Sequence, residues 1–135
     1  MTEKVPKILI GCPTYYGHKH CIKRFIEALK NLTWKNFDVL FVDNSLDNDY
    51  SKIITAEGYE VLRNPASKEK IVNIVDNRNK IISRAIEKNH DYLFFVDTDV
   101  LLPQDAIEKL LKVNQPIVSG VYLGGMPIAD EVRIA

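Results

Sequence analysis

Short apolar runs alternate with amphipathic segments along this sequence, and the alternation limits the folds that it can adopt. Strand-like runs are "KILIG", "FDVLFVDNS", "YEVLR", "YLFFV" and "PIVSGVYLGG", at residues 7–11, 37–45, 59–63, 92–96 and 116–125. Helical spacing fills the intervals, at residues 18–32, 48–58, 70–89 and from Pro103 onward. This order predicts an α/β fold, a mostly parallel sheet with helices on both faces. The 135 residues are enough for one such domain.

The longest predicted helix spans residues 70–89. Its apolar residues recur at helical spacing, which predicts that one stripe faces the core. The residues of this stripe are Ile71, Ile74, Val75, Ile82, Ala85 and Ile86.

The composition excludes several classes of protein. Lys and Arg together number 18, and so do Asp and Glu, so the chain has no net field that would attract DNA or an anionic membrane. Cys12 and Cys21 are too few for a disulfide scaffold, and we expect no redox or metal role for them. No signal peptide precedes the first strand, and the apolar runs are too short to span a bilayer. We therefore expect a soluble cytoplasmic protein.

Acidic residues close two of the predicted strands. Asp97-Thr98-Asp99 follows "YLFFV", and Asp43-Asn44 ends "VLFV". In open parallel sheets, ligands bind beyond the carboxyl ends of the strands. The end of the first strand, residues 12–16, should lie at the same edge. The sequence therefore predicts that the candidate site is formed there.

The two aspartates of the D-x-D sequence would repel each other. At ~6 Å and an effective dielectric of ~20, the repulsion is about 3 kcal/mol. If the backbone stays extended, Asp97 and Asp99 project to the same side. Such oxygen ligands suit Mg²⁺ or Mn²⁺, which complete their coordination with substrate phosphates. The alternative is that both acids cap the following helix or a turn.

In order and spacing, these motifs resemble the nucleotide-sugar-binding half of a family 2 glycosyltransferase with the Rossmann-like GT-A fold. "ILIGCPTYYG" is similar to the first strand and Pro-Thr-Tyr loop of that family, and "VLFVDNS" to its second strand. "RNKIISRA" resembles its Arg-Asn helix, and "LFFVDTDVLLPQDAIEKLL" its D-x-D strand with the helix that follows. The resemblance covers nearly the whole chain and implies one domain, residues 1–135, whose acceptor-binding half is missing or very short.

The resemblance also implies roles for individual residues. Pro13, Thr14 and Tyr15 would line the nucleobase pocket, where a Tyr ring can stack. Asp43 and Asn44 match the site that holds the base. Many members have a second acid in place of Asn44, and since an amide both donates and accepts hydrogen bonds, the base stays open.

A second group of residues would bind the diphosphate and its metal. The resemblance implies that Arg78 and Asn79 lie near the base or the diphosphate, although Arg78 could equally be an exposed helix residue. Asp97 would contact the ribose or the metal with its waters, and Asp99 would ligate Mn²⁺ or Mg²⁺ directly.

The implied reaction is transfer of a sugar from a UDP-, GDP- or dTDP-linked donor to an acceptor hydroxyl, with inversion. The metal would stabilise the leaving nucleotide, and a carboxylate base would assist the acceptor. In this family the base follows the D-x-D region. Asp130-Glu131 is the one acidic candidate there, although it reads more simply as a solvated end.

Other functions remain open at this stage. The chain could be a fragment of a longer transferase, or a module that binds nucleotide-sugars without transferring them. A haloacid-dehalogenase-type phosphatase would use Asp97 as its nucleophile, but that pattern wants Thr or Val where this chain has Leu101. His18, His20 and Cys12 could suggest zinc, but no second ligand cluster follows, and we expect the two histidines to lie at a solvated helix start.

Overall fold

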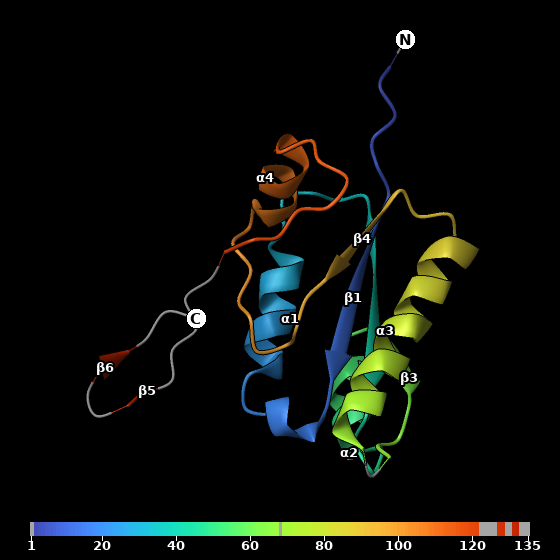
Figure 1. Ribbon diagram of the computed structural model, residues 1–135, viewed down its shortest axis with the longest axis vertical. Coiled ribbons are helices and arrows are strands. Elements are labelled where there is room, and N and C mark those ends of the chain that lie inside the picture. Colours follow the sequence, from blue (N-terminus) through green and yellow to red (C-terminus); the bar gives the residue numbers. More distant parts are fainter. Residues whose placement is uncertain (1, 68, 122–126, 129–130, 133–135) are drawn as a thin grey trace.

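The computed structural model describes residues 2–67, 69–121, 127–128 and 131–132. Four strands and four α-helices make up the main body, and a short 3₁₀ helix, η1, follows the first strand (Figure 1). In chain order the elements are β1 (Ile8–Thr14), η1 (Tyr16–His18), α1 (Ile22–Lys30), β2 (Phe37–Asp43), α2 (Asp49–Ala56), β3 (Glu60–Arg63), α3 (Lys70–Glu87), β4 (Tyr92–Phe95), α4 (Ala106–Lys112), β5 (Pro127–Ile128) and β6 (Glu131–Val132).

The first four strands form a parallel sheet in the order β3-β2-β1-β4 (Figure 1). They confirm four of the five predicted strands. The prediction of a fifth is wrong for residues 116–121, where the structure has no strand, and residues 122–125 lie outside the described residues. Because all four strands run the same way, their carboxyl ends meet at one edge of the sheet.

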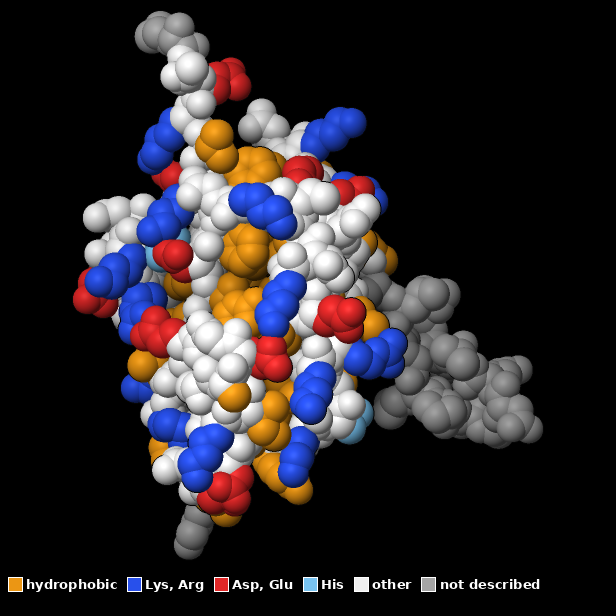
Figure 2. Space-filling model, turned by 180° about the vertical axis from the view of Figure 1, so that it is seen from behind, with side chains coloured by type: hydrophobic (Ala, Val, Ile, Leu, Met, Phe, Trp, Pro, Cys, Tyr) orange, Lys and Arg blue, Asp and Glu red, His pale blue; other side chains and the backbone are white. Residues whose placement is uncertain are grey.

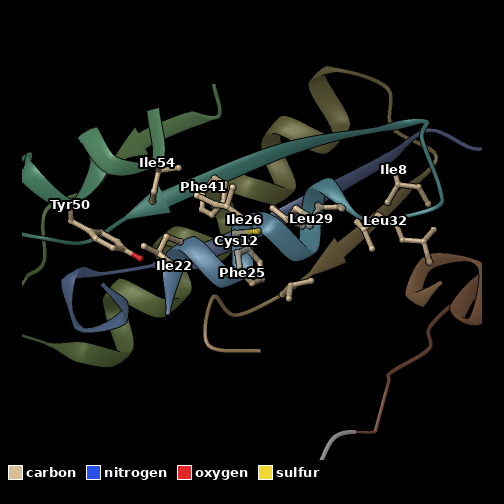
Figure 3. Close-up of a cluster of buried hydrophobic side chains, with 13 residues drawn as sticks. Ile8, Cys12, Ile22, Phe25, Ile26, Leu29, Leu32, Phe41, Tyr50 and Ile54 are labelled. Atoms are coloured by element: carbon tan, nitrogen blue, oxygen red, sulfur yellow. The ribbon is translucent and has the colours of Figure 1, made fainter. Parts of the chain in front are cut away.

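Helices cover both faces of this sheet, as predicted. In Figure 1, α1 and α4 lie on one side of β1 and α3 lies on the other. The first face has the larger core, in which α1, the turn after it, α2 and the sheet contribute the side chains labelled in Figure 3: Ile8, Cys12, Ile22, Phe25, Ile26, Leu29, Leu32, Phe41, Tyr50 and Ile54. On the second face, a smaller cluster joins α3 to the sheet through Leu9, Leu40, Val42, Ile81 and Ala85.

The inward face of α3 differs from the predicted one. Of the six residues expected to face the core, only Ala85 is buried; the exposed ones are Ile71, Ile74, Val75, Ile82 and Ile86. Asn77 and Ile81 accompany Ala85 toward the sheet, at helical spacing. A Cβ atom at Gly11 would collide with Ile81, so α3 can approach β1 this closely because residue 11 is glycine.

The surface carries charges of both signs. On the face seen in Figure 2, Lys and Arg alternate with Asp and Glu around a central band of hydrophobic side chains. No helix among the described residues is long and apolar enough to cross a membrane.

Candidate functional site at the carboxyl ends of the strands

Hydrogen bonds join three strand ends directly. The Asn44 N–H, just after β2, donates to the Thr14 carbonyl oxygen at the end of β1, at 3.0 Å. The Thr14 hydroxyl lies 2.7 Å from the Thr98 hydroxyl, in the D-x-D sequence after β4. Pro13 fits in β1 because β4 ends opposite Gly11 and needs no N–H from residue 13. The structure thus brings together three segments that the sequence predicts to share one edge.

A buried chain of polar groups runs through this junction. The hydroxyls of Tyr50 and Thr98 each lie 2.7 Å from the Thr14 hydroxyl, and the Thr98 hydroxyl is 2.6 Å from His18 Nδ1. Thr14, Tyr50 and Thr98 are at most 3% exposed. Burial raises the pKa of Tyr50 to about 12, so the phenol is protonated at neutral pH. Figure 3 shows Tyr50 extending from α2 toward Ile22 of α1.

The D-x-D sequence forms a turn. The condition under which Asp97 and Asp99 would project together, an extended backbone, is not met, because the Val100 N–H donates to the Asp97 carbonyl oxygen at 3.1 Å. The turn buries Thr98 and leaves the side chains of Asp97 and Asp99 51% and 55% exposed. Within residues 2–67 and 69–121, each carboxylate has one distant cationic or polar neighbour. Arg78 Nη2 is 4.0 Å from Asp97, and His18 Nε2 is 3.8 Å from Asp99.

Asp43 has an entirely different environment. It is fully buried, and Arg63 Nη1 donates to its Oδ2 at 2.5 Å. Its Oδ1 accepts hydrogen bonds from the Ser45 N–H at 2.8 Å and the Ser45 hydroxyl at 2.6 Å. In the sheet register, Asp43 is the direct partner of Arg63 on β3. Both oxygens of this predicted base-binding residue are therefore used inside the protein.

Asn44 belongs to a cluster of three amides. Its Nδ2 donates to Asn77 Oδ1 at 3.0 Å, and Asn77 Nδ2 donates back to Asn44 Oδ1 at 2.5 Å. Asn64 Nδ2 donates to the same Asn77 oxygen at 2.8 Å. Asn77 is 1% exposed, so these bonds satisfy its buried amide. The cluster fixes the side chain of Asn44 at the end of β2.

The remaining predicted residues differ in their distance from this edge. Arg78 lies over the ring of Phe95, with Cζ 5.0 Å from the ring centroid, and so stays next to Asp97. The side chain of Asn79 is exposed and makes no hydrogen bond to the described residues, while its backbone belongs to α3. Tyr15 is 52% exposed, and its ring packs at a tilt against His18, with the centroids 4.8 Å apart. The structure groups Pro13, Thr14, Tyr15 and Arg78 with the D-x-D turn, and leaves Asn79 apart.

A groove begins at Asp97 and Arg78 and extends along β4 toward α4. It encloses about 880 Å³ and is lined at this end by Phe95 and Val96 as well. A space of this size is within the range of small-molecule sites.

The donor atoms of the D-x-D turn are suited to a hard divalent cation that brings other ligands with it. Asp97 and Asp99 offer exposed carboxylate oxygens, the ligand type that Mg²⁺ and Mn²⁺ prefer. No three His, Cys, Asp or Glu side chains of the described residues lie close enough to form a complete metal site. Waters and substrate oxygens would therefore have to complete the coordination.

The structure argues against a zinc site made with Cys12. Burial raises the pKa of the Cys12 thiol well above its ordinary value, and the negative charge of Asp97 adds to the rise. Cys12 is fully buried, and neither it nor any other His, Cys, Asp or Glu of the described residues belongs to a group of three that could hold a metal ion. His20 Nδ1 lies against the Gly17 carbonyl oxygen instead.

Sequence reasoning missed three residues of the site. His18 is not part of a solvated helix start, because its side chain is only 18% exposed and is held by Thr98. Tyr50 was expected only as part of a helix, and Asn77 was not singled out. Asn77 left one signal in the sequence, since it shares the helical spacing of Ile81 and Ala85. The candidate base Asp130 lies outside the described residues, and for Glu131 only its place in β6 is described.

Comparisons with known proteins agree with the observed fold. The mannosyltransferase PcManGT from Pyrobaculum calidifontis, solved in complex with GDP-Man and Mn²⁺, is similar with a TM-score of 0.68 and 18% identity, over 92% of this chain and 37% of that one. S. aureus TarS is similar with a TM-score of 0.59 and 18% identity, over 78% of this chain and 19% of that one. A TarS 1-349 structure in complex with UDP gives the same score and identity, over 31% of its chain.

These likenesses confirm the predicted Rossmann-like GT-A fold, and the chain spans well under half of each matched structure. No curated protein sequence matches it significantly. A family model described as glycosyl transferase family 2 matches residues 10–130, which decides against the phosphatase alternative. Since that match covers most of the sequence, the chain belongs to glycosyl transferase family 2.

Proposed function

We propose that this chain binds a nucleotide-diphosphate sugar and is the donor-binding part of an inverting, metal-dependent glycosyltransferase. One observation carries the proposal. In a chain of this family, the joined ends of β1, β2 and β4 present two exposed carboxylates that accept no hydrogen bond from the described residues. Donor chemistry of this kind is supported by the similar structures, which hold GDP-Man with Mn²⁺ or UDP.

The base would lie at the ends of β1 and β2. The exposed ring of Tyr15 offers a stacking surface. The Asn44 amide is oriented by Asn77 and can present a donor or an acceptor to a base edge if it exchanges one of its present bonds. Asp43 would act indirectly, because its bonds to Ser45 fix a hydroxyl that accepts the Tyr16 N–H at 2.8 Å.

The diphosphate would lie at the D-x-D turn. Asp99 and Asp97 would hold Mn²⁺ or Mg²⁺, and Arg78, which already lies beside Asp97, would add a positive charge for phosphate oxygens. A divalent cation bound there supplies Lewis acidity to the departing nucleoside diphosphate. Asn79 would need a different helix orientation to take part.

The experiment is a titration of UDP-, GDP- and dTDP-sugars with and without Mn²⁺, followed by an assay of sugar release and transfer. We expect Mn²⁺-dependent binding that Asp97→Asn/Asp99→Asn together weaken by at least tenfold. Asp38→Asn is the matched control, since Asp38 is an exposed carboxylate at the opposite end of β2. Binding that ignores both Mn²⁺ and the double replacement would contradict the proposal. Binding without transfer would identify a nucleotide-sugar-binding module.

A further inference from the structure

His18 is the polar side chain that connects the buried hydroxyl chain to the D-x-D turn. Its Nδ1 lies 2.6 Å from the Thr98 hydroxyl, and its Nε2 lies 3.8 Å from Asp99 Oδ2. The ring is held further by Tyr15, whose ring centroid is 4.8 Å away. The imidazole is therefore fixed with one nitrogen toward the interior and the other toward a proposed metal ligand.

The direction of the hydroxyl chain determines which nitrogen carries the proton. Each hydroxyl has one proton to donate. Tyr50 is fully buried, and its hydroxyl makes its direct hydrogen bond with the Thr14 hydroxyl, at 2.7 Å, while the Thr98 hydroxyl is a secondary neighbour. If the Tyr50 O–H did not donate to Thr14, a buried donor would be left without a well-placed acceptor, which is unfavourable.

The directions of the other hydrogen bonds in the chain follow from this first one. Since Thr14 accepts from Tyr50, its own proton goes to the other neighbour, the Thr98 hydroxyl. Thr98 in turn donates to His18 Nδ1. A neutral imidazole whose Nδ1 accepts a hydrogen bond carries its proton on Nε2.

We propose that His18 is a positioning residue for Asp99: the Tyr50–Thr14–Thr98 chain holds it as the Nε2–H tautomer, and this N–H faces the Asp99 carboxylate as a donor. The inference rests on the proposed function, because it concerns the acid that would ligate the metal. A protonated Nε2 cannot itself ligate a metal. At 3.8 Å the contact is longer than a hydrogen bond, so the half-exposed Asp99 side chain would have to rotate toward Nε2 to form one. One carboxylate oxygen is then held by His18 and the other is left for the cation.

The tautomer can be tested without any metal. Long-range ¹H–¹⁵N correlation spectra of the imidazoles, recorded on the neutral form, distinguish a protonated Nε2 from a protonated Nδ1. We expect the Nε2–H pattern for His18 in the full chain, with Thr98→Val as the variant that removes its hydroxyl partner. A Nδ1–H pattern in the unaltered protein would overturn the inference.

Replacements of His18 test its role toward Asp99. Asparagine mimics the position of Nδ1, and glutamine can place an N–H at the position of Nε2. Loss of a group that orients a metal ligand typically weakens metal affinity 10–100-fold. By isothermal titration with Mn²⁺ alone, we expect His18→Ala and His18→Asn to weaken affinity about tenfold, and His18→Gln to stay within about threefold of the unaltered protein. The control His20→Ala should change nothing, and thermal melting shows that each variant folds.

The possible results distinguish the positioning role of His18 from the proposed donor-binding function of the chain. If Asp99→Asn abolishes Mn²⁺ binding while His18→Ala leaves it unchanged, the role of His18 is wrong and the proposed function stands. If the unaltered protein binds no Mn²⁺, the proposed function fails and the role fails with it. Electron spin-echo spectra give a third reading, since imidazole nitrogen coupled directly to Mn²⁺ would show His18 to be a ligand and overturn the inference. We expect no such coupling.

Discussion

Asp43 and Asp99 follow similar apolar strands in the sequence, yet the structure treats them in opposite ways. Asp43 is fully buried and paired with Arg63 at 2.5 Å. The side chain of Asp99 is 55% exposed, and its Oδ2 lies 3.8 Å from His18 Nε2. A buried carboxylate needs a cation and hydrogen bonds, whereas an exposed one is solvated by water and can exchange that water for a ligand. The comparison separates an acid that holds the sheet end together from one that is available for binding.

Replacing the buried acid, Asp43, should have the largest effect on the free energy of unfolding. Asp43→Asn leaves Arg63 largely buried without its counterion and weakens two bonds to Ser45. Breaking a buried pair by removing one partner costs about 3 kcal/mol of unfolding free energy. Urea denaturation of the full chain would measure the loss.

Asp49→Asn is the control for this loss, because Asp49 lies in an exposed pair with Lys52 on the surface of α2. Exposed pairs contribute about 0–1 kcal/mol. If Asp43→Asn cost no more unfolding free energy than Asp49→Asn, the distinction between the buried acid Asp43 and the exposed acid Asp99 would not hold. The double change Asp43→Asn with Arg63→Met should restore part of the stability, since no uncompensated charge remains.

The sequence predicted where the acids lie, but not which of them is buried and paired with a cation. Short apolar runs and their acidic ends follow from local pattern, and these gave four strands and the edge of the site. The neutralisation of Asp43 depends on the pairing of β2 with β3, which places Arg63 opposite Asp43 in the register. Local sequence pattern does not predict which strands pair. The contact of His18 with Thr98 was not predicted for the same reason, because Thr98 lies 80 residues further along the chain.

The error in α3 has a different origin. Two apolar stripes run along that helix, one through Ile71, Val75, Ile82 and Ile86 and one through Ile81 and Ala85. Helical spacing alone favours the richer stripe. The structure turns the poorer one inward because Gly11 makes room for Ile81 and Asn44 supplies an amide partner for Asn77. The buried face of α3 is therefore the one that carries Asn77 together with Ile81 and Ala85.

Breaking the hydroxyl chain of Tyr50, Thr14 and Thr98 beside the D-x-D turn should have an intermediate effect on the free energy of unfolding. Tyr50→Phe removes one buried hydrogen bond to Thr14, which costs about 1 kcal/mol at neutral pH. The native state raises the pKa of Tyr50 from 10.0 to about 12 and so holds its proton more tightly than the unfolded state. The stability contributed by Tyr50 is therefore complete below pH 10 and is lost as the pH rises toward 12. Urea denaturation of both proteins should show the difference in unfolding free energy closing, since the unaltered protein loses about 1 kcal/mol by pH 11. A constant difference from pH 8 to pH 11 would contradict this.

Replacing the exposed acid, Asp99, should have the smallest effect on the free energy of unfolding. The Asp99 carboxylate accepts no hydrogen bond from the described residues and is more than half exposed, so Asp99→Asn leaves no buried group without a partner. Replacements of this kind usually change stability by no more than about 0.5 kcal/mol, and the relief of repulsion with Asp97 acts in the stabilising direction. Urea denaturation without added metal should therefore give the same midpoint as the unaltered protein. A loss close to that of Asp43→Asn would mean that Asp99 is a structural residue, and that exposure of a strand-end acid does not by itself identify a binding group.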